Sequence, residues 1–155
     1  KNSFKDLPTK VIKETMVDAN RMRAKKESIQ IEKYGKQKQF DLTQTGSGLY
    51  YWVYEVDSTQ TDSAHPGLFA EVNMVITLLN GDTCYDYREV GSERFLIERD
   101  NIESGLHEGI QHLTVGDKAI IVLPSHLAHG VIGDRGKIPP LSSVVYDVEL
   151  LKLSR

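Results

Sequence analysis

The last third of the chain holds the feature that most restricts what this sequence can fold into. Residues 116–153 read GDKAIIVLPSHLAHGVIGDRGKIPPLSSVVYDVELLKL, with apolar runs on either side of a glycine-rich segment that ends in Ile138-Pro139-Pro140. Apolar runs bounded by glycine and proline are typical of strands joined by a loop. We therefore expect a strand at residues 118–123, a long loop, and a closing strand at residues 142–153.

The middle of the chain continues the strand pattern and adds one short helix. Asn80-Gly81 is a strong tight-turn signal. Asn101 is expected to cap a helix in which Leu106, Ile110 and Leu113 recur at helical spacing. The expected fold class is α+β, an antiparallel sheet with one helix laid across it. From their aromatic and β-branched residues, further strands are expected at residues 49–56, 68–79 and 94–99.

The N-terminal part is expected to be a helical extension. Pro8 and Thr9 are good start signals for a helix over residues 8–34, and Gly35 is a typical stop. Residues 36–48 have the composition of a linker, with glycine and serine at the end. The expected division is residues 1–47 for the extension and linker, and residues 48–155 for the main domain.

One face of this helix carries an apolar stripe. The stripe is too short and broken for a coiled coil, so three arrangements are open. The helix packs on the domain, pairs with a second copy in a homodimer, or stands as a spacer outside the core. The members of the stripe are Ile12, Met16, Ala19, Met22 and Ile29, interrupted by Lys26 and Lys33.

Charge is spread unevenly along a chain of ordinary composition. Hydrophobic residues make up 39% of the 155 residues and charged residues 26%, as in a typical globular protein. Residues 1–38 hold 11 Lys and Arg against 5 Asp and Glu, whereas residues 39–155 hold 8 against 17. This pattern fits a solvated basic helix on an acidic domain, or a basic stalk that lies near an anionic membrane or docks on the acidic body.

Residues 103–153, from ESGLHEGIQHLTVGDKA to VVYDVELLKL, resemble the C-terminal part of FK506-binding-protein (FKBP) type peptidyl-prolyl isomerases. The resemblance implies a curved antiparallel β-sheet wrapped around one short helix, with the N-terminal helix as an extension. It implies isomerisation of X–Pro bonds in proline-containing polypeptides and an FK506-like macrolide as a further ligand. It implies no cofactor, no metal and no nucleic-acid partner.

An enzyme of this kind needs an apolar cup rather than a nucleophile. Rotation about a peptide bond faces a barrier of about 18–20 kcal/mol, because resonance stabilises the planar amide. The twisted transition state has lost that resonance and is less polar, so a water-poor apolar pocket favours it. The residues that line the cup therefore decide the prediction of function.

Six positions match the substrate pocket of the family. The resemblance makes the Glu103 backbone N–H a donor to a substrate carbonyl and places Leu106 at the pocket floor, where many members have tryptophan. It places His129 where the family has a tyrosine hydroxyl, for which an imidazole N–H can substitute. Each side chain alone fits an ordinary core, and their joint placement favours the pocket. The six residues are Ile102, Glu103, Leu106, His129, Ile138 and Tyr146.

Other expected pocket positions depart from the family's pattern. Met74 stands for a pocket tyrosine, Cys84 for a phenylalanine, and Phe95 lies two residues after the equivalent of another aromatic residue. Tyr85 stands where an aspartate is usual, and Asp86 comes one residue late. Either a slip or bulge of one residue restores their aromatic and acidic roles, or the pocket lacks the carboxylate. A less aromatic cup predicts modest activity, with a preference for apolar residues before proline.

Two motifs of other chemistries are incomplete. His126 and His129 form an HxxH pair, but no Cys or carboxylate cluster completes a metal ligand set. Gly130, Gly133 and Gly136 do not form a phosphate loop, because no Walker-type lysine follows them. The sequence therefore favours a site that works without a metal or nucleotide.

The helical stalk, the SGLYYWVYE strand and the NGDTCY turn together resemble the envelope lipoprotein isomerases of Bacteroidota, including gliding-motility-associated members. That resemblance implies a periplasmic or cell-envelope location and membrane tethering through a lipid anchor upstream of Lys1. Two functions remain open. One is an isomerase that assists the folding of exported proteins, and the other is a weakly active or inactive FKBP-like chaperone or peptide-binding module.

Overall fold

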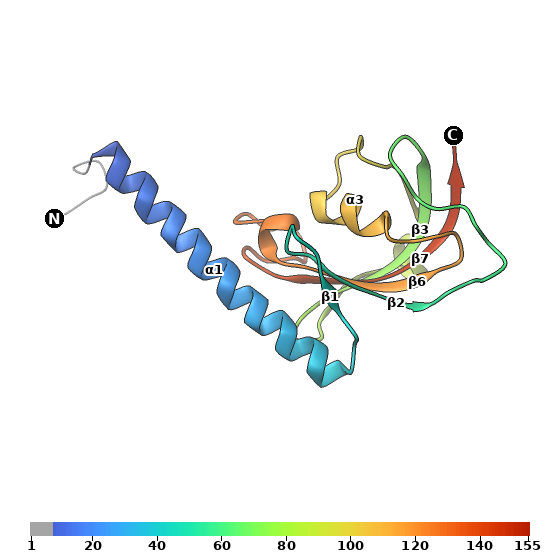
Figure 1. Ribbon diagram of the computed structural model, residues 1–155, viewed down its shortest axis with the longest axis horizontal. Coiled ribbons are helices and arrows are strands. Elements are labelled where there is room, and N and C mark those ends of the chain that lie inside the picture. Colours follow the sequence, from blue (N-terminus) through green and yellow to red (C-terminus); the bar gives the residue numbers. More distant parts are fainter. Residues whose placement is uncertain (1–7) are drawn as a thin grey trace.

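The computed structural model describes residues 8–155, which form one antiparallel sheet with a helix on each side (Figure 1). The helices are α1 (Thr9–Lys38), α2 (Tyr87–Val90) and α3 (Ser104–Ile110), and a 3₁₀ turn lies at Ser125–Leu127. The strands are β1 (Thr43–Gln44), β2 (Tyr50–Glu55), β3 (Phe69–Leu78), β4 (Thr83–Asp86), β5 (Glu93–Leu96), β6 (Lys118–Leu123) and β7 (Val144–Ser154).

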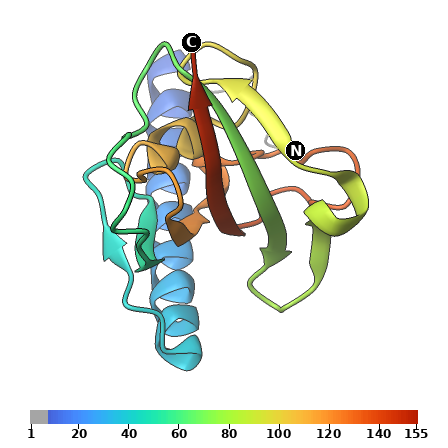
Figure 2. The same ribbon diagram turned by 90° about the vertical axis from the view of Figure 1, so that its right-hand side faces the viewer.

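The sheet is built around the long antiparallel pair of β3 and β7. β3 pairs with β7 along its whole length, from Phe69 opposite Ser154 to Leu78 opposite Val144. The strand order is β1-β2-β6-β7-β3-β4, and β5 pairs with the first half of β3, on the edge that β4 occupies further along. Figure 2 shows β5, β3 and β7 side by side, and the strands curve around α3 in Figure 1. This is the α+β architecture expected from the sequence.

Strand β6 explains why the sheet is covered on both faces. All five residues from Ala119 to Leu123 are buried, and the run is apolar without alternation. Ile121 belongs to the main core with α3, whereas Ile120 and Val122 belong to a second cluster with α1. Neighbouring side chains of a strand point to opposite faces. A strand of this composition therefore needs a partner layer on each side.

The C-terminal half of α1 supplies the layer on the second face. Ile31 is fully buried there, and Tyr34 retains only 8% of its surface. The Tyr34 ring meets Phe40 edge to face, with ring centres 5.9 Å apart. The second cluster consists of Ile31, Tyr34, Tyr50, Ile120, Val122 and Val145, and Phe40, Leu42, Trp52 and Leu79 pack against it.

The apolar stripe expected from the sequence is not the face of α1 that packs. Met16, Met22 and Ile29 are 56%, 73% and 58% exposed, whereas Ile31 is buried against the sheet. The first half of the helix extends away from the sheet (Figure 1). No helix in residues 8–155 is both long and apolar enough to cross a membrane.

The helix also ends later than expected. Gly35 continues the helix, and a Cβ there would lie only 2.8 Å from Leu42 Cδ1, so its absence lets Leu42 pack directly on the helix. Gln39 ends the helix in the left-handed conformation, with φ of 62°, and the Phe40 N–H donates to the Gly35 carbonyl. The expected linker at residues 36–48 therefore contains the last turn of α1 and the short strand β1.

The short helix α3 starts later than expected as well. Its N-cap is Glu103, which makes no side-chain capping hydrogen bond, and Asn101 lies outside the helix. Strand β4 and helix α2 were not expected, because segments of only four residues have weak sequence signals.

A buried carboxylate joins α1 to the other end of β6. Glu27 is 5% exposed, and its two oxygens accept hydrogen bonds from the Ser125 backbone N–H and hydroxyl, both at 2.7 Å. Ser125 is itself 2% exposed. Hydrogen bonds to charged groups are stronger than those between neutral groups. This contact therefore fixes the position of the 3₁₀ turn relative to the helix.

Replacing Glu27 with alanine is expected to lower the free energy of unfolding by about 2–3 kcal/mol, because two buried donors of Ser125 lose their acceptor. Urea titration followed by circular dichroism measures the loss. Glu14→Ala, at an exposed position on the same helix, is the matched control. Equal stability of the two variants would show that this contact does not hold α1 to the domain.

Candidate functional site

A cavity of about 450 Å³ opens between the concave face of the sheet, α3 and the loop that precedes β7. We call residues 128–143 the flap loop. The walls come from β3, β4, β5, the segment before α3, α3 itself and the flap loop. The lining residues are Val72, Met74, Ile76, Tyr85, Val90, Gly91, Glu93, Asn101, Ile102, Glu103, Leu106, His129, Asp134 and Ile138.

The floor of the cavity is apolar and continuous with the main core. Val72 and Met74 come from β3, Leu106 from α3 and Ile138 from the flap loop, and each of them is at most 7% exposed. The alternation along β3 turns Val72 and Met74 to the side of α3. Because the floor is part of the folded core, it exists before any ligand binds.

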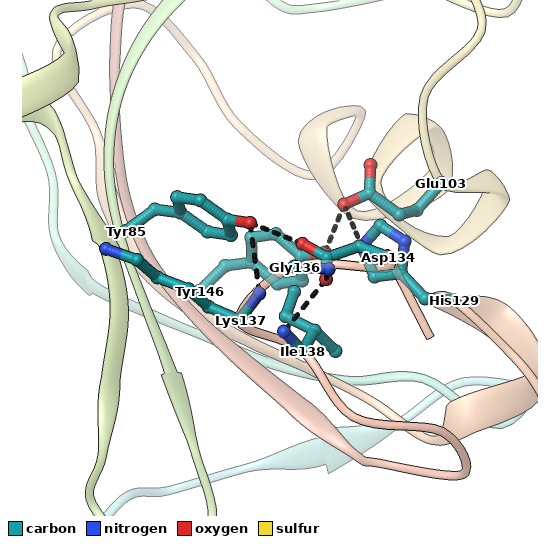
Figure 3. Close-up of polar contacts among 8 residues, drawn as sticks. All are labelled: Tyr85, Glu103, His129, Asp134, Gly136, Lys137, Ile138 and Tyr146. Carbon is teal, nitrogen blue, oxygen red and sulfur yellow. Dashed lines mark hydrogen bonds and ion pairs between the residues drawn. The ribbon is translucent and has the colours of Figure 1, made fainter. Parts of the chain in front are cut away.

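Glu103 places a carboxylate at one wall of this apolar cavity (Figure 3). Its Oε1 accepts hydrogen bonds from the Tyr146 hydroxyl at 2.5 Å and from His129 Nε2 at 3.0 Å. Tyr146 is fully buried on β7. Burial, and then the negative charge of Glu103, raise the pKa of Tyr146 well above its usual value. Tyr146 therefore stays protonated, and its hydroxyl donates a hydrogen bond to the Glu103 carboxylate.

The backbone N–H of Glu103 can donate a hydrogen bond at the cavity wall. The residue is the N-cap of α3, with φ of −57° and ψ of 134°, and its carbonyl accepts from the N–H groups of Leu106 and His107. Within residues 8–155 its own N–H donates no hydrogen bond. This N–H is therefore available to a ligand.

Asp134 organises the flap loop from within. Its Oδ1 accepts from the backbone N–H groups of Gly136 at 2.8 Å and Ile138 at 2.9 Å, and its Oδ2 accepts from the Tyr85 hydroxyl at 2.5 Å (Figure 3). Burial alone would raise the pKa of Asp134, but the bonds from Tyr85, Ile138 and Gly136 hold it below its usual value. Gly133 has φ of 75°, and a Cβ there would collide with the Ile138 carbonyl oxygen.

A bulge in β4 decides which side chains face the cavity. Ile76 pairs with Tyr85 and Thr77 pairs with Thr83, so Cys84 is the extra residue. Tyr85 lines the cavity, whereas the Asp86 side chain binds Arg88 and caps α2 outside it. Of the two alternatives left open by the sequence, the structure has the bulge, which turns Tyr85 toward the cavity. The carboxylate next to Tyr85, however, is Asp134 of the flap loop rather than Asp86.

The sequence profile of the FKBP-type peptidyl-prolyl cis-trans isomerase family matches residues 60–151, which include every residue that lines this cavity. The chain belongs to this family. The family match therefore covers the same segments that supply the floor, the Glu103 wall and the flap loop.

Individual FKBP-type relatives support the assignment. The isomerase FkpA of Escherichia coli K12 is 33% identical over 120 residues, which are 77% of this chain and 42% of that protein. A peptidyl-prolyl cis-trans isomerase of Saccharomyces cerevisiae is 33% identical over 90 residues, 57% of this chain and 67% of that protein. The chain thus spans about two fifths of the length of FkpA.

Solved FKBP-type structures have the same fold. The crystal structure of E. coli FkpA matches with a TM-score of 0.67 at 26% identity, covering 96% of this chain and 74% of that one. A peptidyl-prolyl isomerase of Pseudomonas syringae matches with a TM-score of 0.70 at 20% identity, covering 87% of this chain and 96% of that one. The curved sheet around a short helix is therefore the fold of these proteins.

Most residues that the FKBP resemblance selected meet at the cavity. Tyr146 does not line the cavity itself, but its hydroxyl binds the Glu103 carboxylate, which does. Two expected pocket residues lie in the core instead: Phe95 is 2% exposed and packs edge to face on His107, and Cys84 is 3% exposed beneath the flap loop. Those that line the cavity are Met74, Tyr85, Ile102, Glu103, Leu106, His129 and Ile138.

Two acidic residues of the cavity were not selected from the sequence. Glu93 lies at the start of β5, and Asp134 lies in the flap loop. An aspartate before Arg135-Gly136 is a common turn signal, which could have marked Asp134 as an organiser of the loop. Within residues 8–155, no group of three His, Cys, Asp or Glu residues is arranged to hold a metal ion.

The hydrogen bonds of Asp134 predict a pH-dependent flap loop. Because its pKa is lower in the folded chain, its stabilising effect is present above the unfolded value and is lost as the pH falls below about 4. Hydrogen exchange at the Gly136 and Ile138 amides should therefore lose protection below that pH. Asp134→Ala should lose it already at pH 7, because both amides lose their acceptor.

The control for this measurement is Asp57→Ala, because Thr59 also lowers the pKa of that carboxyl through hydrogen bonds, in a loop remote from the cavity. It should leave the Gly136 and Ile138 amides protected at pH 7. Unchanged protection in Asp134→Ala would show that other contacts hold the flap loop.

Proposed function

We propose that this chain is a peptidyl-prolyl cis-trans isomerase that acts on X–Pro bonds in polypeptides by non-covalent catalysis. The observation that carries the proposal is the preformed apolar floor of Val72, Met74, Leu106 and Ile138, enclosed by segments that match the FKBP family. The floor offers a prolyl ring a surface free of water.

Catalysis follows from the contrast between this floor and the polar wall. A prolyl amide that twists loses resonance and polarity, so transfer from water to the cavity favours the twisted form over the planar one. The Glu103 N–H holds a neighbouring carbonyl, which limits the motion to rotation about the X–Pro bond. Lowering the barrier by about 5 kcal/mol corresponds to an acceleration of about 10³–10⁴-fold.

The enzyme reading predicts a specific effect of Ile138→Ala. This change should lower kcat/KM for short X–Pro peptides about tenfold, because roughly 1.4 kcal/mol of apolar contact with the twisted amide is lost. A protease-coupled isomerisation assay measures it. Ile132→Ala removes the same atoms from a side chain of the same loop that is 57% exposed, and should retain full activity. Equal activity of the two variants would contradict the proposed site.

A peptide-binding module with little catalysis is the second candidate. It is supported by the engagement of two tyrosine hydroxyls, since Tyr85 in the cavity lining binds Asp134 and the buried Tyr146 binds Glu103. His129 Nε2 is bound to Glu103 as well. If the wild-type chain binds proline-containing peptides but does not isomerise them faster than the uncatalysed rate, the peptide-binding function replaces the proposed isomerase function. Competition by an FK506-like macrolide would map the ligand to the same cavity.

We further propose that the chain works on exported proteins in the periplasm or cell envelope. This placement rests on the resemblance of the stalk and the NGDTCY turn to Bacteroidota envelope lipoproteins, and the lipid anchor upstream of Lys1 is part of the same proposal. The division into an extension at residues 1–47 and an isomerase domain at residues 48–155 is proposed with it, with residues 1–7 outside the described part. The contact between Glu27 and Ser125 crosses this division.

The exposed apolar face of α1 supports a homodimer through this helix. Met22 and Ile29 lie seven residues apart on one side of α1 and are both more than half exposed. Met22→Glu should therefore convert dimers to monomers in sedimentation velocity. Asn20→Glu adds the same charge on the other side of the helix and should leave the dimer intact. A wild-type chain that sediments as a monomer at all concentrations would refute this contact.

A further inference from the structure

The cavity that we assign to the prolyl peptide is acidic. Glu93 of β5, Glu103 at the start of α3 and Asp134 of the flap loop all line it, and none of the lining residues is a lysine or arginine. His129 is the one basic side chain among them. Three separate elements thus bring carboxylates to one apolar cavity.

All three carboxylates act on one buried group at the cavity wall. Burial raises the pKa of the Tyr146 hydroxyl, and the negative charges of Glu103, Glu93 and Asp134 raise it further. Of the three, Glu103 touches this hydroxyl directly.

Of these three carboxylates, only Glu103 is bonded to a basic side chain within residues 8–155. It accepts from His129 Nε2 as well as from the neutral Tyr146 hydroxyl, whereas Asp134 accepts from Tyr85 and two backbone N–H groups. Partial loss of hydration at the rim, and then the nearby charge of Glu103, raise the pKa of Glu93. Within residues 8–155, the Glu93 carboxylate accepts no hydrogen bond, although its backbone pairs with Val72 in the sheet. A cation next to Glu93 would relieve this repulsion.

The lysine of the flap loop does not supply that cation. The Lys137 ammonium lies over the Tyr85 ring, 5.6 Å from its centre. Its side chain runs along the ring, away from Glu103 and His129 (Figure 3). Among the residues that line the cavity, the acidic side chains therefore outnumber the basic ones.

We propose that this cavity selects prolyl bonds preceded by lysine or arginine, and that Glu93, Glu103 and Asp134 set the preference. The prolyl ring occupies the apolar floor, and the stem of the preceding side chain runs along the wall to place its charge at the rim. This inference rests on the proposed isomerase function. It replaces the preference for apolar residues that the sequence alone predicts.

The test compares blocked tetrapeptides Ala-X-Pro-Phe in which X is lysine, Nε-acetyl-lysine or glutamate. Acetylation removes the charge and keeps the stem, so the ratio of kcat/KM for lysine over acetyl-lysine isolates the electrostatic contribution. We expect a ratio of about five at low ionic strength, falling toward one at about 1 M salt, where the screening length is about 3 Å. The glutamate peptide should be the slowest of the three.

Glu93→Gln should lower this ratio to about two, since it removes one charge and no hydrogen bond. Glu71→Gln is the control, because Glu71 lies on β3 next to Val72 and points to the other face of the sheet. It should leave the ratio unchanged. A ratio of one at low salt, or a ratio that Glu93→Gln does not change, overturns the inference. Absence of catalysis with every peptide overturns the proposed isomerase function instead.

Discussion

A single strand that is apolar on both faces determines how the rest of the chain is arranged. Because β6 buries Ile121 toward α3 and Ile120 toward α1, the sheet needs a helix on each side. Both helices then act at the end of β6, where the chain leaves the sheet. α3 brings Glu103 to His129 of the flap loop, and α1 brings Glu27 to Ser125 just before that loop. The α3 layer thus borders the cavity, and the α1 layer holds the turn from which the chain enters the flap loop.

The parts of the fold that could be predicted from the sequence are those with a strong local pattern. The apolar runs at β6 and β7 and the Ile138-Pro139-Pro140 segment predicted two strands and a loop between them, and the structure has them there. Leu106 and Ile138 could be selected for the cavity because the resemblance to the FKBP family places them there. A local pattern thus decided the backbone, and the family resemblance decided which side chains face the cavity.

The other features of the fold and the site depend on where side chains point, which no local sequence pattern specifies. The sequence suggested only a backbone role for Glu103, and the two hydrogen bonds to its side chain come from residues 26 and 43 positions away. The bulge at Cys84 decides that Tyr85 faces the cavity, and Asp86 is diverted by Arg88. The face of α1 that packs did not follow from the sequence, because a helix with hydrophobic residues on two sides offers two choices. Tertiary contacts select between them.

The contact between Glu27 and Ser125 also has a consequence for the order of folding. These residues are 98 positions apart, so α1 is synthesised long before its partner. Until β6 and the following turn are made, the Glu27 carboxylate and the Ile31 side chain have no place to pack and stay in water. Closing so long a segment is entropically costly and is associated with slow folding. The helix that comes first along the chain therefore docks only after β6 and the following turn are in place, and the turn at Ser125 gains its buried carboxylate partner only then.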